Sequence, residues 1–591
     1  MKIEFFTAKQ TDGKTAIDDV TKTISRLVWL RLLCFLLLLV FTAAGWDYGF
    51  VFYTLAVVCL LAFLVLLELH RRHQHTLQRL TAEQRVLQQY IDRFSSAWQQ
   101  SPETGSCYLR EDFPQAKDLD LFGPASVYQY ICAARTGPGR DKLAAALSPT
   151  PPAAADIRSR QEGTAEFIAD PQLSLKIQTL LALLPPAHAT AELAHELEKA
   201  PVLPQYFMKF TTCLFGALTW SCLLLAAGNE LSWIWPAGGM FLQFTLAGLF
   251  YSRTASYLAP LNNLSRTLQP YQQIFYLLEN STFTSAHLKQ LQLILRRNGG
   301  ASRVIGHLST VTACATMRSN LIFYVLANAL FLWDFHCQLL FAYWRSQEGQ
   351  DISRWIDALA EVELLLSLAV IGQVKEEYCF PEILVEESPQ LAAKDIKHVL
   401  IHEATAVPNS LTAASQTCII TGSNMSGKTT FLRTLAASTI LAYAGSPVCA
   451  KEFTIARMEL FTSMRVQDDT AKGLSTFYAE LLRIKTMVEY SHKALPQFVL
   501  IDEIFKGTNS ADRIIGAREA IRKLTKPWCL TFVSTHDFEL CDMAEKDGLP
   551  LVNYHFAEYY TADEIHFDYK LKSGRCESTN AKYLLKLAGI L

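Results

Sequence analysis

Four long apolar runs stand out in the first half of the chain. They cover residues 27–45, 49–67, 210–227 and 233–251, and apart from Arg31 in the first run they contain no charged residue. Each run is close to the ~20 residues that a helix needs to cross a bilayer. Because only a short polar turn separates the members of each pair, the pattern predicts two transmembrane hairpins, at 27–67 and 209–251.

The charges around these runs indicate an orientation. Basic residues flank both hairpins on the side away from the turns, whereas the turns carry Asp47 and Glu230. Lysine and arginine are enriched in cytoplasmic loops. We therefore expect a multi-pass protein of the inner (cytoplasmic) membrane, with the turns outside and everything else in the cytoplasm. For the second hairpin, which lies inside a core-like region, a buried pair of core helices stays open.

A fifth apolar run, 320–344, is interpreted differently. Asp334 and His336 lie near its middle, and ionisable side chains are costly in lipid. A fifth span would also place the C-terminal region outside the cell. We therefore expect one buried helix of the core here.

The stretch 70–100 follows the first hairpin and is rich in arginine, glutamine and leucine. Its apolar residues keep a spacing of three and four, which is typical of a helix with one apolar face. They are Leu77, Leu80, Leu87, Ile91 and Phe94, with Gln84 filling the one gap. Two interpretations stay open: a short coiled coil that extends the second span, and an amphipathic helix on the surface of the protein.

A phosphate-binding pattern follows a short apolar strand in the C-terminal third. Residues 422–429 fit G-x-x-x-x-G-K-[ST], with the apolar run 418–421 before them and a helix-forming stretch after them. Glycines let main-chain N–H groups surround a phosphate, and the helix N-terminus adds partial positive charge. In this pattern Lys428 would reach the β- and γ-phosphates, and the Thr429 hydroxyl would bind Mg²⁺. The pattern predicts that ATP is held by Gly422, Ser423, Asn424, Met425, Ser426, Gly427, Lys428, Thr429 and Thr430.

A second motif supplies carboxylates for the same site. Residues 498–501 are apolar and are followed by Asp502 and Glu503. Such a pair at the end of a buried strand can hold the Mg²⁺ shell and orient the attacking water. We expect Asp502 to act with Thr429 on the metal, and Glu503 to be the catalytic base.

Five motifs in the C-terminal region together resemble the MutS family. Residues 421–430 are similar to its T-G-P-N-M-[GS]-G-K-S-T, and residues 442–450 to A-Y-I-G-S-x-V-P-A. Residues 468–480 resemble D-D…R-S-T-F-M-V-E, and 502–509 resemble D-E-I-G-R-G-T-S. Residues 535–540 resemble T-H-Y-F-E-L. The resemblance is strong over 415–591 and weak over 118–414.

The resemblance implies roles for two further residues. His536 would sense the γ-phosphate from the end of its strand. Ser475 would approach the γ-phosphate of the opposite subunit, so that a homodimer encloses two ATP molecules. ATP binding would close this dimer and hydrolysis would open it.

The chain also departs from the family pattern. No counterpart of the mismatch-reading domain precedes the core, and the loop before Ser475 has Lys472-Gly473-Leu474 where S-G-R is usual. Lys506 replaces an arginine. The sequence also stops at Leu591, without residues for the C-terminal dimerisation element of many members.

Together these patterns predict a multidomain α and α/β fold. It would combine transmembrane hairpins, an all-α core and lever region, and an ABC-type P-loop ATPase with a mainly parallel sheet flanked by helices. The expected parts are an N-terminal segment (1–26), the first hairpin (27–67), a helical linker (68–117), the first part of the core (118–208), the second hairpin (209–251), core and lever helices (252–395) and the ATPase domain (396–591).

Charge and cysteine usage limit the partners. The net charge is −2 and no dense basic stripe is present, unlike most nucleic-acid-binding surfaces. Specific mismatch reading is therefore disfavoured, whereas weak or structure-selective DNA contact stays open. The 14 cysteines include no C-x-x-C pair, so we expect neither zinc nor disulfides.

Three functions remain in competition at this stage. The first is a membrane-anchored MutS-like ATPase that acts on DNA or on a DNA-repair partner. The second is a membrane scaffold whose nucleotide state controls an unknown protein partner without DNA. The third is half of an ABC-type transporter, which the absence of an L-S-G-G-Q loop and the small number of spans disfavour.

Overall fold

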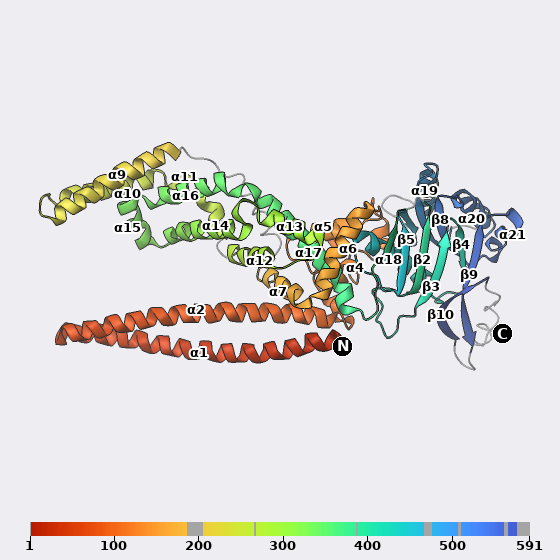
Figure 1. Cartoon of the computed structure of the whole chain (residues 1–591), viewed down its shortest axis with the longest axis horizontal. Coiled ribbons are helices and arrows are strands. Elements are labelled where there is room, and N and C mark those ends of the chain that lie inside the picture. The colour runs from red at the N-terminus through yellow and green to blue at the C-terminus, as the bar shows by residue number, and fades with distance from the viewer. Residues whose placement is uncertain are drawn as a thin grey trace.

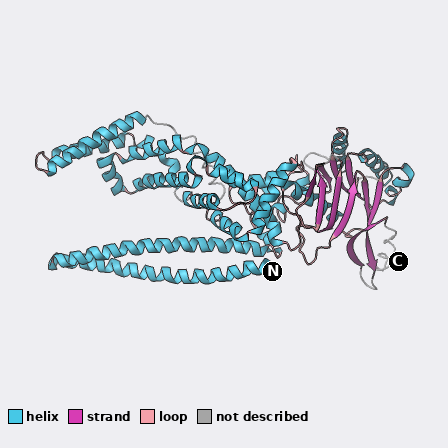
Figure 2. Ribbon diagram, viewed as in Figure 1, coloured by secondary structure: helices cyan, strands magenta, loops and turns pink. Residues whose placement is uncertain are grey.

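Two helical arms extend to one side of a central helical region, and the β-sheets lie at the opposite end (Figure 1). The computed structural model describes residues 2–185, 205–264, 267–385, 388–465, 476–505, 510–560 and 565–575. The chain is mostly helical, with its strands gathered in the C-terminal part (Figure 2). This agrees with the prediction of a multidomain α and α/β fold.

The first arm is an antiparallel pair of very long helices, α1 (Lys2–Tyr48) and α2 (Phe50–Asp92). The chain reverses at Gly49, whose φ of 85° favours glycine. The apolar runs lie toward the closed end of this pair, where side chains such as Trp29 and Val65 are exposed. Residues 70–92 of the 70–100 stretch therefore continue the second helix, which contacts α1 along the arm and α7 at its end, so the structure has features of both interpretations.

The open end of the arm is fastened to the central region. Phe6 is buried and stacks on Tyr90, with ring centroids 4.5 Å apart. The Lys2 ammonium group donates a hydrogen bond of 2.7 Å to the Gly372 carbonyl. Within the predicted N-terminal segment 1–26, residues 2–26 are thus part of α1.

The central region surrounds one buried helix, α17 (Ile352–Val374). Its Glu363 carboxylate accepts hydrogen bonds from the main-chain N–H groups of Arg135, at 2.7 Å, and Thr136, at 3.0 Å. It thereby fastens the start of α5 to α17. α4 (Val127–Ile131), α5 (Gly137–Ala146) and α6 (Ala154–Ala169) pack against α17. The same region also contains α3 (Gln115–Asp118) and α7 (Pro171–Leu181).

The second arm holds the remaining helices before the sheets. They are α9 (Gln205–Ala227), α10 (Ile234–Leu249), α11 (Tyr251–Leu264), α12 (Leu268–Asn280), α13 (Ala286–Leu295), α14 (Ala301–Thr316), α15 (Leu321–Phe331) and α16 (Trp333–Gln347). Short 3-10 turns connect several of the elements along the chain; they are η1 (Ser96–Gln100), η2 (Ser106–Tyr108), η3 (Arg297–Gly299), η4 (Met317–Ser319), η5 (Gly349–Asp351) and η6 (Phe538–Leu540).

By length and composition, three described helices could cross a membrane: α1, α2 and α9. The count rises to four if the bent pair α15–α16 forms one span. The run 233–251 forms a helix of only 16 residues, α10, before the chain breaks at Phe250.

The prediction of one buried helix over 320–344 was wrong. The run forms two helices, α15 and α16, which meet at an angle of 83°. Leu332 breaks them apart, since its φ of 50° lies in the left-handed region. Asp334 on α16 is buried as expected, but α15 exposes Leu321 and Ile322.

Two sheets form the C-terminal end of the molecule. The smaller has the strand order β1-β5-β2-β3 and the larger β10-β9-β4-β8-β7-β6. The strands are β1 (Glu382–Leu384), β2 (Gln390–Ile396), β3 (Asn409–Ala414), β4 (Thr417–Thr421), β5 (Glu452–Ala456), β6 (Glu459–Ser463), β7 (Gln497–Asp502), β8 (Cys529–Ser534), β9 (Leu551–Tyr560) and β10 (Ile565–Ser573).

The larger sheet is parallel from β9 to β6, and only β10 runs antiparallel to its neighbour. Its central strands β4, β7 and β8 are buried on both faces, which explains their continuous apolar runs. Cys418 and Ile420 pack toward α18, whereas Ile419 packs toward α19 and α20. The helices of this end are α18 (Lys428–Ala444), α19 (Thr476–Ser491), α20 (Ser510–Leu524) and α21 (Met543–Asp547).

Candidate functional site

The loop between β4 and α18 is shaped by two glycines. Gly422 has a φ of 144° and Gly427 a φ of 109°, conformations that other residues rarely adopt. A Cβ atom on Gly422 would also lie 2.8 Å from the carbonyl oxygen of Phe556. The loop therefore approaches β9 closely and ends at the N-terminus of α18, where main-chain N–H groups can bind an anion.

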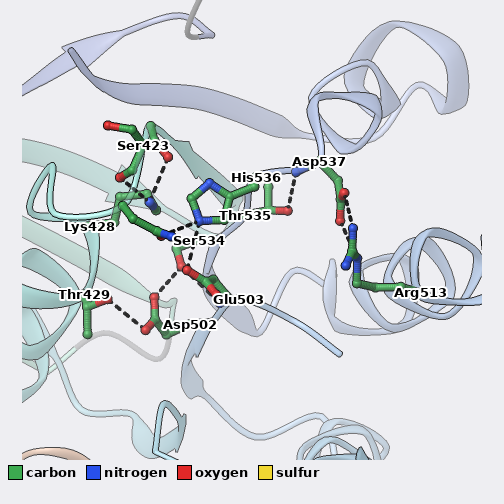
Figure 3. A network of polar contacts seen from close by, with 12 residues as sticks. Ser423, Lys428, Thr429, Asp502, Glu503, Arg513, Ser534, Thr535, His536 and Asp537 are labelled. Atoms are coloured by element: carbon green, nitrogen blue, oxygen red, sulfur yellow. Dashed lines mark hydrogen bonds and ion pairs between the residues drawn. The ribbon is translucent and has the colours of Figure 1, made fainter. Parts of the chain in front are cut away.

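Lys428 is the first residue of α18, and its side chain lies back along this loop. Its ammonium group donates hydrogen bonds of 2.8 Å to the carbonyl oxygens of Gly422 and Ser423 (Figure 3). The side chain is buried, with 4% of its surface exposed. A positive charge is thereby held inside the loop, next to the helix N-terminus.

The other loop residues differ in what they contact. The Ser423 hydroxyl donates to the Glu558 carboxylate on β9, and Asn424 meets His536. Met425, with a φ of 71°, is exposed at the tip of the loop. The Ser426 hydroxyl is buried and makes no hydrogen bond within the described part of the chain. Thr430 lines a cavity beside the loop.

Asp502 lies across from the start of α18 because β4, β8 and β7 are parallel neighbours that end at one edge. Its carboxylate accepts a hydrogen bond of 2.8 Å from the Thr429 hydroxyl. The other carboxylate oxygen accepts from the Ser534 hydroxyl at 2.5 Å. Ser534 is paired with Asp502 in the β7–β8 register, and sequence reasoning did not single it out.

The oxygen donors at this point fit a magnesium ion. Mg²⁺ prefers oxygen ligands and is usually held by one or two carboxylates, with water and substrate phosphates completing its shell. Thr429 and Asp502 supply a hydroxyl and a carboxylate within contact of each other. Over the described ranges, no group of three or more histidine, cysteine or acidic residues forms a larger metal cluster.

Glu503 follows Asp502 in a left-handed backbone conformation, with a φ of 55°. Its N–H group donates to the carbonyl oxygen of Ser534 at 3.1 Å, which continues the pairing of β7 with β8 past the strand end. Its carboxylate lies 2.9 Å from Nε2 of His536. The turn thus directs the Glu503 carboxylate toward the loop, while the Asp502 carboxylate faces Thr429 (Figure 3).

His536 connects this carboxylate to the loop between β4 and α18. The same Nε2 atom lies 2.9 Å from the side-chain oxygen of Asn424. The residue after it, Asp537, forms a paired salt bridge with Arg513 on α20, at 2.8 and 2.9 Å. This bridge holds the segment after β8 in place, and Arg513 was not anticipated from the sequence.

Asp118 and Asp120 in the central region contact the same end of the sheet. Buried Asp118 accepts hydrogen bonds from Arg483 on α19, at 2.9 Å, and from the N–H group of Arg465, at 3.1 Å. Asp120 accepts from Arg465 at 3.0 Å and from Arg433 on α18 at 3.3 Å. These two carboxylates, the Asp118–Asp120 cluster, thereby connect α18, α19 and the segment just before residue 466 to the central helices.

A cavity of about 330 Å³ opens beside the loop between β4 and α18. It is lined by residues including Gly427, Thr430, Phe431, Phe556 and Tyr569. His398 also lines it, and burial lowers the pKa of this imidazole to about 4, with Arg433 adding to the effect. The cavity is therefore largely apolar and its histidine is neutral at pH 7.

Some predicted residues lie outside the described part of the chain. They are Ser475 with Lys472, Gly473 and Leu474 before it, the motif residues 468 and 469, and residues 506–509 after the carboxylate pair. The last residues, 576–591, also lie outside it.

Comparison with known proteins finds MutS relatives for the region around the site. Residues 418–590 match the family model described as MutS domain V. The DNA mismatch repair protein MutS of Natronomonas pharaonis is 31% identical over 240 residues, which cover 39% of this chain and 27% of that protein. Its counterpart in Streptococcus agalactiae is 33% identical over 241 residues, with the same coverage of 39% and 27%.

A third relative, the DNA mismatch repair protein MutS of Carboxydothermus hydrogenoformans, is 30% identical over 250 residues, which cover 41% of this chain and 29% of that protein. The chain thus spans little more than a quarter of the length of these curated relatives. The likeness includes the loop at 422–430, the carboxylate pair and His536, all within 418–590.

Proposed function

Because this chain belongs to the MutS family through its C-terminal region, we propose that it is a membrane-anchored, Mg²⁺-dependent ATP hydrolase. Its ATP-driven dimer closure would control an interaction with a DNA-related complex or with a protein partner. The relatives are named DNA mismatch repair proteins. For this chain we propose only that its partner belongs to such a DNA-related process.

The single observation that carries this proposal is the convergence of four chemically distinct groups on one loop. Lys428 lies within the loop, and Thr429 contacts Asp502. Glu503 contacts His536, which in turn contacts Asn424 in the loop. The loop N–H groups would bind the phosphates, and Lys428 would neutralise their charge. Phosphoryl transfer of this kind depends mostly on positioning and charge stabilisation.

Some of these side chains would bind the metal, and others would act on the attacking water. Thr429 and Asp502 would hold Mg²⁺, which supplies charge neutralisation at the phosphates when bound. The Glu503 carboxylate would orient and deprotonate the attacking water. His536 would hold that carboxylate at its Oε1 atom and, through Asn424, couple it to the loop.

The cavity beside the loop supports binding of the nucleotide base. It begins at Gly427, next to the phosphate-binding segment, and its aromatic residues Phe556 and Tyr569 can contact a flat ring. Since His398 is neutral at pH 7, no charge on that side chain opposes an uncharged base. ATP would then extend from this cavity across the loop toward Asp502 and Glu503.

The apolar helix faces support the membrane anchor. Exposed side chains cluster on α1 and α2, such as Leu36 and Val58, and on α9, such as Leu218 and Leu224. These helices lie at the end of the molecule away from the sheets (Figure 1). Burial of such faces in lipid would place the ATPase end in the cytoplasm, well below the bilayer.

One competing function is favoured by a specific observation. The net charge of −2 supports a nucleotide-switched membrane scaffold without DNA binding. The DNA-related function and the scaffold function share the ATPase and differ only in the partner that it controls.

The proposal is tested with the full-length protein in detergent or nanodiscs. Glu503→Gln should abolish nearly all steady-state ATP hydrolysis and keep nucleotide affinity, because the carboxylate acts on water and not on the phosphates. Lys428→Ala should weaken nucleotide binding itself. Glu545→Gln, which changes an exposed glutamate on α21, is the matched control and should behave as the unchanged protein. Full turnover in Glu503→Gln would refute the assignment.

A further inference from the structure

α15 is a short helix whose apolar surface is only partly covered. It contains no charged residue and packs on the α9–α10 pair, with Phe331 5.4 Å from Trp220 and Tyr324 6.3 Å from Phe244 between ring centroids. Its outer face remains open: Leu321 is 75% exposed and Ile322 72%. This face continues the exposed apolar faces of α9 and α10.

Aromatic contacts give the depth that α15 reaches along the hairpin. Phe207 on α9 pairs with Phe250 near the base of the α9–α10 pair, at 5.7 Å. Trp220, the partner of Phe331, lies about 20 Å further along α9 at the rise of an α-helix. Tyr324, near the start of α15, contacts Tyr251 at the base, at 6.0 Å. Leu332, which follows α15, belongs to the same buried cluster as Met208 and Ala247 near the base, so α15 lies beside the half of the hairpin that is nearer its base.

The chain then returns to the base instead of continuing. After the break at Leu332, Phe335 on α16 contacts Phe250, with centroids 5.8 Å apart. At Leu332 the chain turns by 83° from the direction of α15 into that of α16. The segment enters and leaves the hairpin on the same side.

Several polar groups near the break have partners. The N–H group of Asp334 donates to the side-chain oxygen of Asn328 at 3.1 Å, and Asn328 itself is fully buried. The Asp334 carboxylate pairs with Arg318 at 3.1 Å, which connects the chain just before α15 to the chain just after it. Irregular backbone at membrane depth requires such internal partners.

We infer that α15 is a re-entrant helix that enters the cytoplasmic half of the bilayer and turns back at Leu332 without crossing. The Arg318–Asp334 pair closes the base of this loop, and lipid acyl chains cover Leu321, Ile322 and Leu326. The inference rests on the proposed membrane anchoring of α9 and α10.

A bilayer fits this face better than a second protein copy does. Exposed apolar side chains occur on all three helices and are not limited to one patch. On α9 and α10 they include Phe210, Leu218, Leu224, Ile234, Phe241 and Leu249. α10 has 16 residues, or about 24 Å, which is shorter than the ~30 Å of a hydrocarbon core. α15 adds lipid-facing surface on the cytoplasmic side, where α10 ends.

A re-entrant α15 also keeps the segments before and after it on the same side of the membrane. Because it does not cross, α16, α17 and the sheets stay on the cytoplasmic side, where ATP is present. α16 packs on α14 and leads into α17, the central helix. The re-entrant helix is therefore connected directly to the part of the molecule that carries the nucleotide site.

The test uses the full chain, with its 14 cysteines replaced, in vesicles of phosphatidylethanolamine and phosphatidylglycerol. Single cysteines at Leu326, Leu218 and Leu293 carry a nitroxide, and the accessibility of each to oxygen and to a water-soluble nickel complex is measured. Leu293 lies on α13 and is 66% exposed, so it is the matched apolar control in water. We expect Leu326 to resemble Leu218, with high access for oxygen and low access for nickel.

The outcomes separate this inference from the membrane anchor. If Leu218 is in lipid but Leu326 resembles Leu293, the re-entrant helix is refuted and the anchor stands. If Leu218 itself is open to nickel, both fail. A cysteine at Phe331, a position that is 44% exposed, should also stay unlabelled by an impermeant maleimide added outside, whereas one at Asn229 in the α9–α10 turn should react. Labelling at Phe331 from outside would mean that α15 and α16 cross the membrane, which also refutes the inference.

Discussion

Nε2 of His536 lies 2.9 Å from a carboxylate oxygen of Glu503, at the ends of the neighbouring parallel strands β8 and β7. The same nitrogen lies 2.9 Å from Asn424 in the loop before α18. A single imidazole thus joins the proposed catalytic carboxylate to the loop that would hold the phosphates. A change in the position of the loop would therefore move the carboxylate.

This relationship predicts that removal of the imidazole lowers the rate of ATP hydrolysis and leaves nucleotide affinity nearly unchanged. His536→Ala should lower kcat roughly tenfold or more, since a base that is no longer held in place orients water poorly, and should change nucleotide affinity only slightly. His536→Gln should restore part of the activity because its amide can still donate to Glu503. Steady-state ATPase rates and nucleotide titrations measure both effects. His492→Ala, at an exposed histidine on another helix end, is the control, and equal losses in the two variants would contradict the role of His536.

The Asp118–Asp120 cluster predicts a second, structural effect. Asp118→Asn removes the charge that faces Arg483 in a buried setting. We expect a loss of about 2–3 kcal/mol in the free energy of unfolding, at the low end of the cost of breaking a buried ion pair, because Arg483 is partly exposed. Thermal unfolding of the full chain measures it.

The control for this variant is Asp112→Asn, at an exposed position of the same segment. Asp118→Asn should also reduce ATP hydrolysis more than nucleotide binding, since Asp118 holds Arg465, which lies close to Ser475 in the sequence. A variant with unchanged thermal stability and unchanged turnover would show that the cluster is dispensable.

The sequence indicated which residues of the candidate site lie together better than it indicated the contacts that support them. Thr429 and Asp502 each belong to a local motif, and parallel strands bring such motifs to one edge of a sheet; the structure has a hydrogen bond of 2.8 Å between them. Their binding of Mg²⁺ stays a prediction. Asp118 and Asp120 belong to no motif, and their partners Arg465 and Arg483 lie hundreds of residues away, so no local pattern could indicate them.

The arm that contains α9, α10 and α15 shows the opposite limit. Apolar runs predicted helices, but 320–344 is as apolar as a single helix would be and still breaks at Leu332. The break depends on capture of the Asp334 N–H group by Asn328 and on the aromatic residues of α9 and α10. These are tertiary contacts, and hydrophobic periodicity does not report them.

His398 predicts a dependence of stability on pH. Its pKa is lowered to about 4 in the folded protein from an ordinary 6.5. Between these values the unfolded chain binds a proton at this residue and the folded chain does not, so the free energy of unfolding falls as the pH is lowered from about 6.5 to 4. The full loss is at most about 3 kcal/mol at 1.36 kcal/mol per pKa unit.

His398→Gln should remove this part of the pH dependence and leave the stability at pH 7.5 nearly unchanged. Denaturant unfolding of both proteins at several pH values between 4.5 and 7.5 measures the difference in slope. His492→Gln serves as the control because it alters an exposed histidine. If the slopes of the His398 variant and the unchanged protein coincide, the imidazole is not held neutral by its surroundings.

The last prediction concerns assembly and the residue outside the described range, Ser475. If Ser475 completes the site of the opposite subunit, a dimer of one Ser475→Ala chain and one Lys428→Ala chain contains one intact site: the unchanged loop of the first chain faces the unchanged Ser475 of the second. Neither variant forms such a site alone. Co-expression with two affinity tags, followed by purification on both, isolates the mixed dimer. We expect it to have about half the ATPase activity of the unchanged protein, as for a symmetric dimer with one of two sites working.

The decisive control places both substitutions in one chain and pairs it with an unchanged chain. In the trans arrangement this dimer has no intact site, because the unchanged loop faces a substituted Ser475 and the unchanged Ser475 faces a substituted loop. If Ser475 acts within its own subunit, the order of the two results reverses: the control dimer keeps half of its activity and the first mixed dimer loses it. The two dimers have identical composition and differ only in how the substitutions are distributed. A difference in rate between them therefore reports the direction of the contact, independently of any effect that the substitutions have on folding or on the membrane anchor.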